Sequence, residues 1–163
     1  GYESLKARME AHVAMCVLAG TSSPLYQEML SEALINAQFS TEIFNGNGFF
    51  TIIIGGESEN PREVRDRVLS AIEQAQKQGL NPALFDEYKK NTYGSLVRKL
   101  NNVSAVTNSL VASHMEECGL YDAMQVLCHM TLEDCNRYVR EEIDVQRATL
   151  SIIEPASYEA KEE

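Results

Sequence analysis

Apolar side chains recur along most of this chain at the spacing of helices that bury one face. The first stripe predicts a helix that reaches about Ala19 and ends at Gly20. Its apolar members are Leu5, Met9, Val13, Cys16 and Val17. The pair Ser22-Ser23 then opens a short amphipathic helix, whose apolar residues are Leu25, Met29 and Leu30.

Two Asn-Pro pairs mark the starts of two longer helices. Asn60-Pro61 and Asn81-Pro82 each place a capping side chain before a proline at the first helical position. Gly79 ends the first of these helices. Their apolar faces are Val64, Val68, Ile72 and Ala75 in the first, and Phe85, Tyr88, Leu96 and Leu100 in the second.

Shorter helices fill the last third of the chain. Ser104 is the expected cap of a helix that ends at Gly119, and a short helix is expected over 121–129. Thr131 and Asp134 form a capping box, which predicts the start of the last helix.

Strand patterns occur in two places. The runs 37–44 and 49–54 flank Asn45-Gly46-Asn47-Gly48, which predicts an antiparallel hairpin. Because the run 49–54 is apolar on both faces, we expect a central strand covered by helices on at least one side. A period of two in 149–153 predicts a further strand of the same sheet.

These patterns predict an α+β fold, in which several helices pack on one face of an antiparallel sheet. Residues 1–155 are expected to form one domain, since the 163-residue chain has a one-domain length. The segment 156–163 is charged and aperiodic, and is expected to be disordered. Gly1 is expected to follow an internal cut or to be left by a tag, so that the native start lies upstream.

The net charge of −10 argues against nucleic-acid binding, which requires clustered cations. Lys89, Lys90, Arg98 and Lys99 do gather, but acidic residues surround them, so a solvated helix face is the favoured interpretation. No apolar run approaches the length of a membrane span, and no membrane partner is expected. Four cysteines without framework spacing favour reduced thiols without disulfides, in a cytoplasmic protein.

Candidate chemistry is sparse. His12 and Cys16 are four residues apart on one predicted helix and could ligate a metal, but their apolar stripe favours a buried, unligated pair. A cluster of possible donors, Cys118, Cys128, His129 and Cys135, lacks the spacing of a structural zinc site. Ser22-Ser23 has no neighbouring base, and the glycine pairs match no phosphate loop.

The order of residues 22–61 and the closing run 149–155 resemble the C-terminal domain of the pitrilysin (insulinase) family of zinc metallopeptidases. The sequence of these segments is most similar to that of the bacterial proteins related to mitochondrial processing peptidase. In that family, a helix that begins at Ser-Ser precedes a strand, a glycine turn and a strand that ends in a Gly-rich step. The resemblance implies a pitrilysin-family fold for nearly the whole chain.

The family binds zinc through an inverted His-x-x-Glu-His motif, which this chain lacks, since no second histidine lies near His12, His114 or His129. The resemblance therefore implies a chain without zinc or catalytic residues. Zinc is expected in an N-terminal domain of a longer parent or in a homologous partner subunit. A peptide is the expected substrate of the whole assembly.

The resemblance also implies positions that face the substrate. The family carries an Arg and, seven positions later, a Tyr that steady the substrate backbone and the oxyanion. Here Glu32 and Phe39 occupy those positions, and neither can stabilise negative charge. Glu32 and Phe39, with the turn residues Gly46 and Gly48, are the substrate-facing candidates. The alternatives are an exposed acid at a helix end for Glu32 and a core residue for Phe39.

Three functions remain open at this point. The first is a non-catalytic domain that forms part of a peptide-binding chamber and of an interdomain interface. The second is a purely structural scaffold, from an inactive homologue, that holds an active partner subunit. The third is an unrelated α+β enzyme with an unrecognised site.

Overall fold

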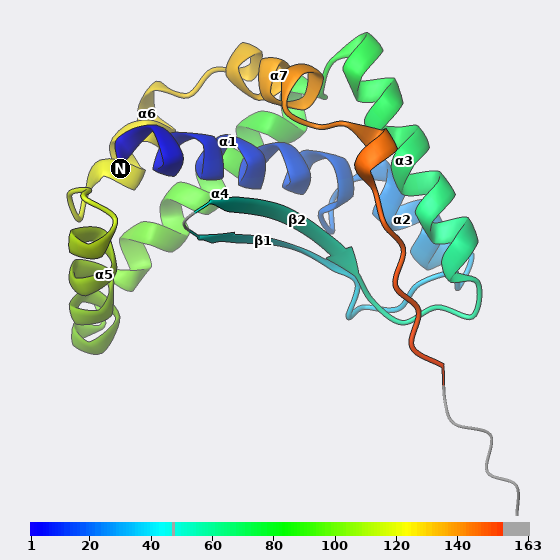
Figure 1. Ribbon diagram of the computed structural model, residues 1–163, viewed down its shortest axis with the longest axis horizontal. Helices are drawn as coiled ribbons and strands as arrows, with labels where there is room; N and C mark the ends of the chain where they lie inside the picture. The colour runs from blue at the N-terminus through cyan, green and yellow to red at the C-terminus, as the bar shows by residue number, and fades with distance from the viewer. Residues whose placement is uncertain (47, 155–163) are drawn as a thin grey trace, which may run out of the picture.

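The computed structural model describes residues 1–46 and 48–154 (Figure 1). The predicted disordered tail and the turn residue Asn47 lie outside these residues. The elements, in chain order, are α1 (Tyr2–Ala19), α2 (Pro24–Ser31), β1 (Ser40–Gly46), β2 (Phe49–Gly55), α3 (Pro61–Gln78), α4 (Pro82–Lys99), α5 (Val103–Met115), α6 (Asp122–His129), α7 (Leu132–Glu141) and the 3-10 turn η1 (Val145–Arg147). The predicted α+β class is confirmed.

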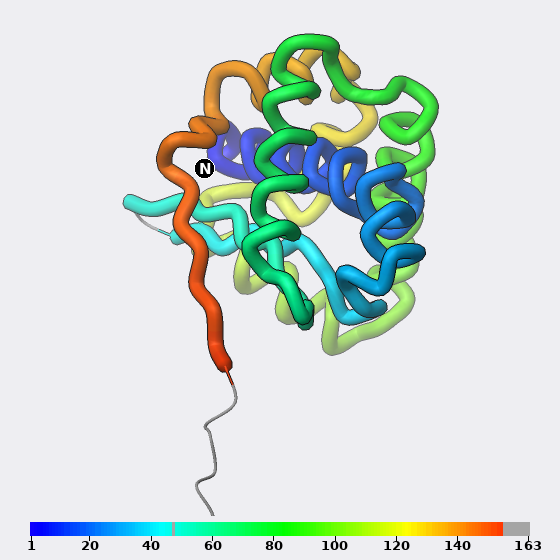
Figure 2. Tube along the Cα trace, turned by 90° about the vertical axis from the view of Figure 1, so that its right-hand side faces the viewer, coloured from blue at the N-terminus to red at the C-terminus, as the bar shows by residue number. Residues whose placement is uncertain are grey.

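Helix α1 is the centre of the molecule. It lies between the hairpin and α7, and it also contacts α2, α3, α4 and α6 (Figures 1 and 2). The sequence predicts one apolar stripe, yet Ala11, Ala14 and Met15 outside that stripe are also buried. A helix that is surrounded on all sides can bury nearly its whole circumference. None of the helices in the described part of the chain is long and apolar enough to cross a membrane.

The predicted helix starts are largely confirmed. Ser23, Asn60 and Asn81 each accept a backbone N–H bond as N-caps, with proline directly after them. Thr131 and Asp134 form the predicted capping box. The prediction for α5 is wrong by two residues, because the side chain of Asn102 rather than Ser104 accepts the N–H of Ala105, at 2.9 Å.

The predicted hairpin is confirmed, with a later start. Strands β1 and β2 pair antiparallel from Ser40 opposite Gly55 to Gly46 opposite Phe49. Residues 37–39 lie outside β1 because the side chain of Asn36 accepts the N–H of Gln38, and the N–H of Phe39 bonds to the Asn36 carbonyl. This local turn delays the strand.

Two expectations about the sheet are wrong. Strand β2 is not central, because β1 is its sole partner among the described residues and one face of β2 is open. The segment 149–153 runs as coil past the hairpin, and Ile153 is 96% exposed. Alternation specifies two faces, but a strand also needs a neighbouring edge to satisfy its backbone groups.

Candidate functional site

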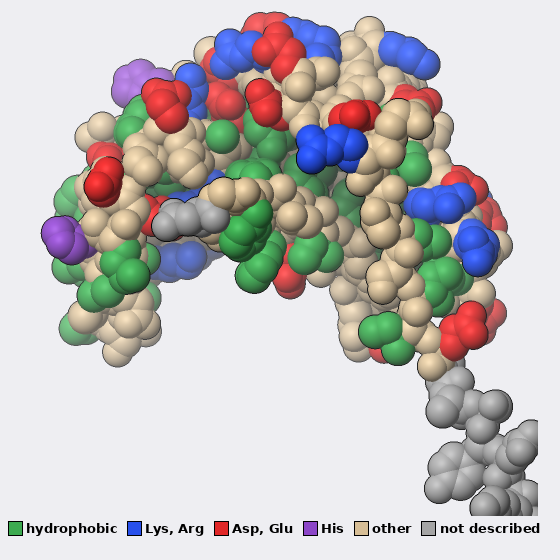
Figure 3. Space-filling view, viewed as in Figure 1, with side chains coloured by type: hydrophobic (Ala, Val, Ile, Leu, Met, Phe, Trp, Pro, Cys, Tyr) green, Lys and Arg blue, Asp and Glu red, His purple; other side chains and the backbone are tan. Residues whose placement is uncertain are grey.

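The hairpin has one covered and one open face. Ile52 and Ile54 of β2 are partly buried against the core that α1 anchors. On the opposite face, Phe44 is 62% exposed, and Phe49 and Ile53 are about half exposed. The Phe44 and Phe49 rings lie 5.5 Å apart, centroid to centroid. In Figure 3, hydrophobic side chains gather on the hairpin along the hollowed side of the molecule.

Gly46 is required for this arrangement of rings. A Cβ at Gly46 would lie 2.6 Å from the Phe49 ring, so a larger residue would displace that ring. Gly48 adopts a φ of +85°, in the left-handed region that glycine favours. The two glycines thus shape the exposed end of the hairpin, where the sequence placed two of its substrate-facing candidates.

The start of β1 and the end of β2 form a shallow open depression. Its volume is about 280 Å³, close to that of small ligand sites. Its lining residues are Gln38, Ser40, Glu42, Ile53, Gly55 and Gly56. Neither strand has a second partner in the described part of the chain, so backbone N–H and C=O groups line both hairpin edges. An apolar face beside unpaired strand edges can receive an extended peptide through backbone hydrogen bonds and side-chain contacts.

Glu32 lies away from this face, at the C-terminal end of α2. Its carboxylate pairs with the Arg67 guanidinium on α3 at 2.5 Å, and Arg67 also binds Glu63 at 2.7 Å. The hydrogen bond from Arg67 holds the pKa of Glu32 below its usual range, so this side chain stays ionised. The placement matches the alternative of an exposed acid at a helix end.

Phe39 is buried, with 4% of its surface exposed. Its ring packs beside Tyr26 of α2, with centroids 6.1 Å apart. Gly56 passes so close that a Cβ there would lie 2.8 Å from the Phe39 Cα. The ring belongs to the core and is closed to a ligand here. The structure therefore does not place Glu32 and Phe39 on the open face with Gly46 and Gly48.

Residues 2–92, more than half of the chain, match the family described as "Peptidase M16 inactive domain". The match runs from α1 through the hairpin into α4. The chain belongs to the peptidase M16 family, as an inactive domain. The predicted identity as a pitrilysin-family C-terminal domain is thereby confirmed.

Similar proteins support this assignment. The uncharacterized zinc protease YmfH of Bacillus subtilis (strain 168) is 26% identical over 96% of this chain. An M16-like peptidase from Alicyclobacillus acidocaldarius matches 86% of the chain with a TM-score of 0.82 and 24% identity. A protease from Helicobacter pylori matches 86% with a TM-score of 0.69 and 20% identity. These two structures establish the fold.

This M16 domain covers only part of its relatives. The chain spans 36% of YmfH and 34% of the Alicyclobacillus peptidase, about a third of each. YmfH is described as a zinc protease, which places zinc in the wider family.

The described residues of this M16 domain do not fit a zinc centre. His12 Nε2 and Cys16 Sγ are 3.8 Å apart, but no group of three His, Cys, Asp or Glu side chains in residues 1–46 and 48–154 is arranged to hold a metal. Burial raises the pKa of Cys16 to about 11 and lowers that of His12, so both side chains are neutral near pH 7. A neutral thiol is neither a good ligand nor a nucleophile. Both residues are partly rather than fully buried, which corrects the prediction of burial.

The sequence did not single out Phe44, Phe49 and Ile53. The run 49–54 is apolar at nearly every position, which hides the difference between its two faces. The partner strand contained the signal, because Ser40 and Glu42 mark the open face of β1, and Phe44 follows them in the same period of two.

Proposed function

We propose that this domain forms one wall of a chamber that holds an extended peptide, opposite a zinc-bearing domain. That domain would belong to the same longer protein or to a homologous partner subunit. The single observation that carries the proposal is the open apolar face of the hairpin, with Phe44 at 62% exposure beside unpaired strand edges. Apolar patches of this kind on a soluble domain mark surfaces that contact a ligand or another domain.

The division of labour follows from the side chains. The hairpin offers apolar contact and backbone hydrogen bonds, which position a peptide without reacting with it. The water-activating Glu and the zinc ligands would come from outside this chain. Glu32, held in an ion pair with Arg67, would not act on the substrate.

The test is a peptidase assay on the longer protein that contains this domain. Phe44→Ser removes a ring that a bound peptide would cover, and we expect KM to rise about tenfold, since 1.4 kcal/mol of lost burial is a factor of ten. Zinc content and kcat should change little. Tyr121→Ser is the matched control, because Tyr121 is an aromatic residue of similar exposure that belongs neither to β1 or β2 nor to the lining of the depression beside them.

A scaffold function gives a different outcome. The resemblance implies that Glu32 stands where the family carries a cation that steadies the substrate, and this expected loss favours the second candidate. A scaffold contacts its partner subunit but no peptide. Phe44→Ser would then leave KM unchanged and would weaken copurification of the partner. That outcome would overturn the chamber-wall proposal and favour the scaffold.

A further inference from the structure

Helix α5 is attached to the molecule more loosely than the other α-helices. It holds no buried residue, whereas α1 to α4, α6 and α7 each bury at least one. Figure 1 shows it at the edge of the molecule. The side chains of α5 that are partly covered are mostly small: Ala105, Val106, Ser109 and Ser113. Little apolar surface therefore holds this helix in place.

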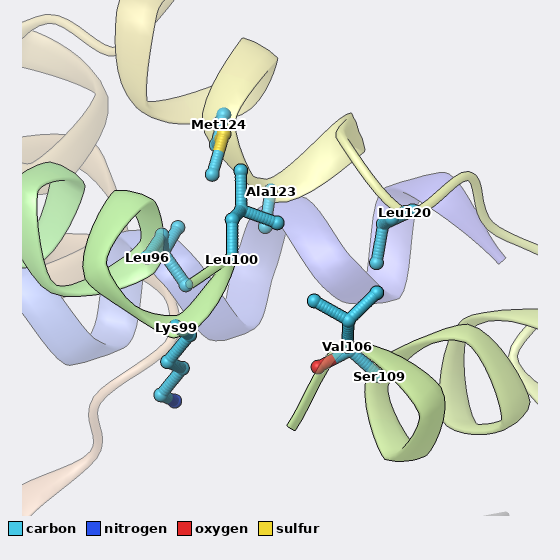
Figure 4. A pocket seen from close by; sticks show the side chains of 8 residues that line it. All are labelled: Leu96, Lys99, Leu100, Val106, Ser109, Leu120, Ala123 and Met124. Atoms are coloured by element: carbon cyan, nitrogen blue, oxygen red, sulfur yellow. The ribbon is translucent and has the colours of Figure 1, made fainter. Parts of the chain in front are cut away.

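The space under α5 is not completely filled. Between α5, α4 and α6 lies a narrow cavity of about 40 Å³, which holds no more than a few waters (Figure 4). Val106 and Ser109 of α5 line one side of it, and Leu96, Leu100 and Met124 of α4 and α6 line the other. Protein interiors are normally close-packed, so this gap removes contacts that would otherwise hold the helix against the domain.

One ion pair joins the end of α5 to the centre of the molecule. Nη1 and Nη2 of Arg8 on α1 donate to the two carboxylate oxygens of Glu116, the residue after α5, at 2.8 Å each. The hydrogen bonding from Arg8 holds the pKa of Glu116 below its ordinary range, so the carboxylate is charged at neutral pH. A bidentate, charged pair of this kind is stronger and more directional than a single hydrogen bond.

The segments on either side of α5 have the geometry of hinges. Residues 100–102, between α4 and α5, form three successive tight turns, in which each N–H bonds to the carbonyl three residues earlier. A short stretch of such bonds often marks a hinge. After α5, Glu117 adopts a φ of +56°, in the left-handed region that favours glycine. The closed position of α5 therefore includes backbone strain, which movement of this segment would release.

We propose that α5 is a flap that opens as a unit on these two hinges while the rest of the domain stays folded, with the Arg8–Glu116 ion pair as its latch. Elements with few buried contacts are the ones that open locally in this way. Opening would uncover apolar side chains of α4 and α6, among them Leu96, Leu100 and Met124. Exposure of this surface would depend on ionic strength, because salt screens the ion pair. The flap does not depend on the proposed peptide chamber, since no residue of the hairpin takes part in it.

The first test is hydrogen exchange of the 163-residue chain, followed by mass spectrometry of peptides that cover each helix. We expect α5 to exchange faster than α1, α3 and α7, but slower than an unstructured peptide, because it is closed most of the time. Arg8→Gln should speed the exchange of α5 about fivefold, the size expected for a bidentate ion pair near the surface. Exchange of α3 should change much less.

Arg140→Gln is the matched control. Arg140 also forms an exposed ion pair, with Glu133, but both residues belong to α7. This variant should leave the exchange of α5 unchanged. Circular dichroism checks that both variants fold.

The second test combines the substitution of Arg8 with salt. Raising the ionic strength from about 0.01 to 1 M shortens the Debye length from about 30 to 3 Å. Exchange of α5 should become severalfold faster in the native chain and change little in Arg8→Gln, in which the latch is already absent. A general effect of salt on stability would instead act equally on both chains.

Four results would overturn the proposal. Exchange of α5 as slow as that of α3 would mean that the helix opens only with the whole domain. Exchange as fast as that of an unstructured peptide would mean that no closed position exists. An Arg8→Gln variant that leaves α5 unchanged, or that speeds every helix equally, would show that the ion pair is no latch. An equal response to salt in the native chain and in Arg8→Gln would show the same.

Discussion

Replacing Glu10 with Gln should stabilise the domain at neutral pH. Glu10 lies on α1 and is 7% exposed, and its Oε1 atom is buried without a hydrogen-bond donor among the described residues. The nearest cations, Lys6 and Arg137, lie 3.8 and 3.9 Å from that oxygen, too far for a hydrogen bond. Burial is the largest influence on this carboxyl and raises its pKa above the ordinary value of 4.5.

The sign of the pH effect follows from linkage. Because the pKa of Glu10 is raised in the folded state, the folded chain holds this proton more tightly than the unfolded chain. The resulting stabilisation is fully present below pH 4.5 and is lost as pH rises through the folded pKa. The contribution of Glu10 to stability therefore becomes less favourable as pH rises toward 7.

The magnitude combines two opposing effects. Gln leaves a neutral polar atom at the same place, so the substitution removes only the added cost of burying a charge, which is part of the about 1–3 kcal/mol or more that an unsatisfied buried group costs. Each partly exposed cation returns about 0.2–1 kcal/mol to the carboxylate. Glu10→Gln should therefore raise the free energy of unfolding by about 1 kcal/mol at pH 7, and by much less near pH 4.

Urea unfolding at the two pH values measures this difference. Glu73→Gln is the matched control, because Glu73 is an exposed glutamate on α3. If Glu10→Gln lowers stability at pH 7 relative to this control, attraction by Lys6 and Arg137 exceeds the cost of burial, and the reasoning is refuted.

Three further predictions concern packing and thiols. Native-state labelling of thiols should modify Cys128 first and Cys135 last, because Cys128 is exposed and burial raises the pKa of Cys135 to about 12. In denaturant without reductant we expect four reactive thiols, and a smaller number would reveal a disulfide. Phe39→Ala should cost about 3–5 kcal/mol in urea unfolding, whereas Phe44→Ala should stay within about 0.5 kcal/mol; equal losses would contradict the assignment of buried and open faces. Gly20→Ala should lower the free energy of unfolding by about 1–3 kcal/mol through overpacking, because its Cβ would lie 2.5 Å from the Tyr88 hydroxyl. Gly55→Ala is the control and should cost less, because the space around Gly55 is free.

Local signals in the sequence predicted most of the helices. The caps at Ser23, Asn60, Asn81 and Thr131 act through bonds to neighbouring N–H groups, so they can be read without knowledge of the fold. The hairpin was predictable for the same reason. The prediction of a strand at 149–153 was wrong, because local alternation does not show whether a distant segment supplies an edge for the strand to pair with.

The candidate site was only partly predictable. Gly46 and Gly48 follow from the turn pattern, and both lie at the exposed end of the hairpin. Phe39 was assigned by position within a resembling motif, whereas its burial depends on Tyr26 and on the close passage of Gly56. Such contacts between separate elements are set by packing and leave no periodic trace in the sequence.

The chamber-wall proposal is tested most directly by kcat/KM for an unstructured peptide, measured on the proposed zinc-bearing domain with and without this chain. We expect no hydrolysis by the chain alone and a large rise in kcat/KM when a saturating amount is added. That rise should be reduced by Phe44→Ser and unaffected by Tyr121→Ser. Hydrolysis by the chain alone that a chelator abolishes, or an unchanged kcat/KM on its addition, would contradict a non-catalytic chamber wall.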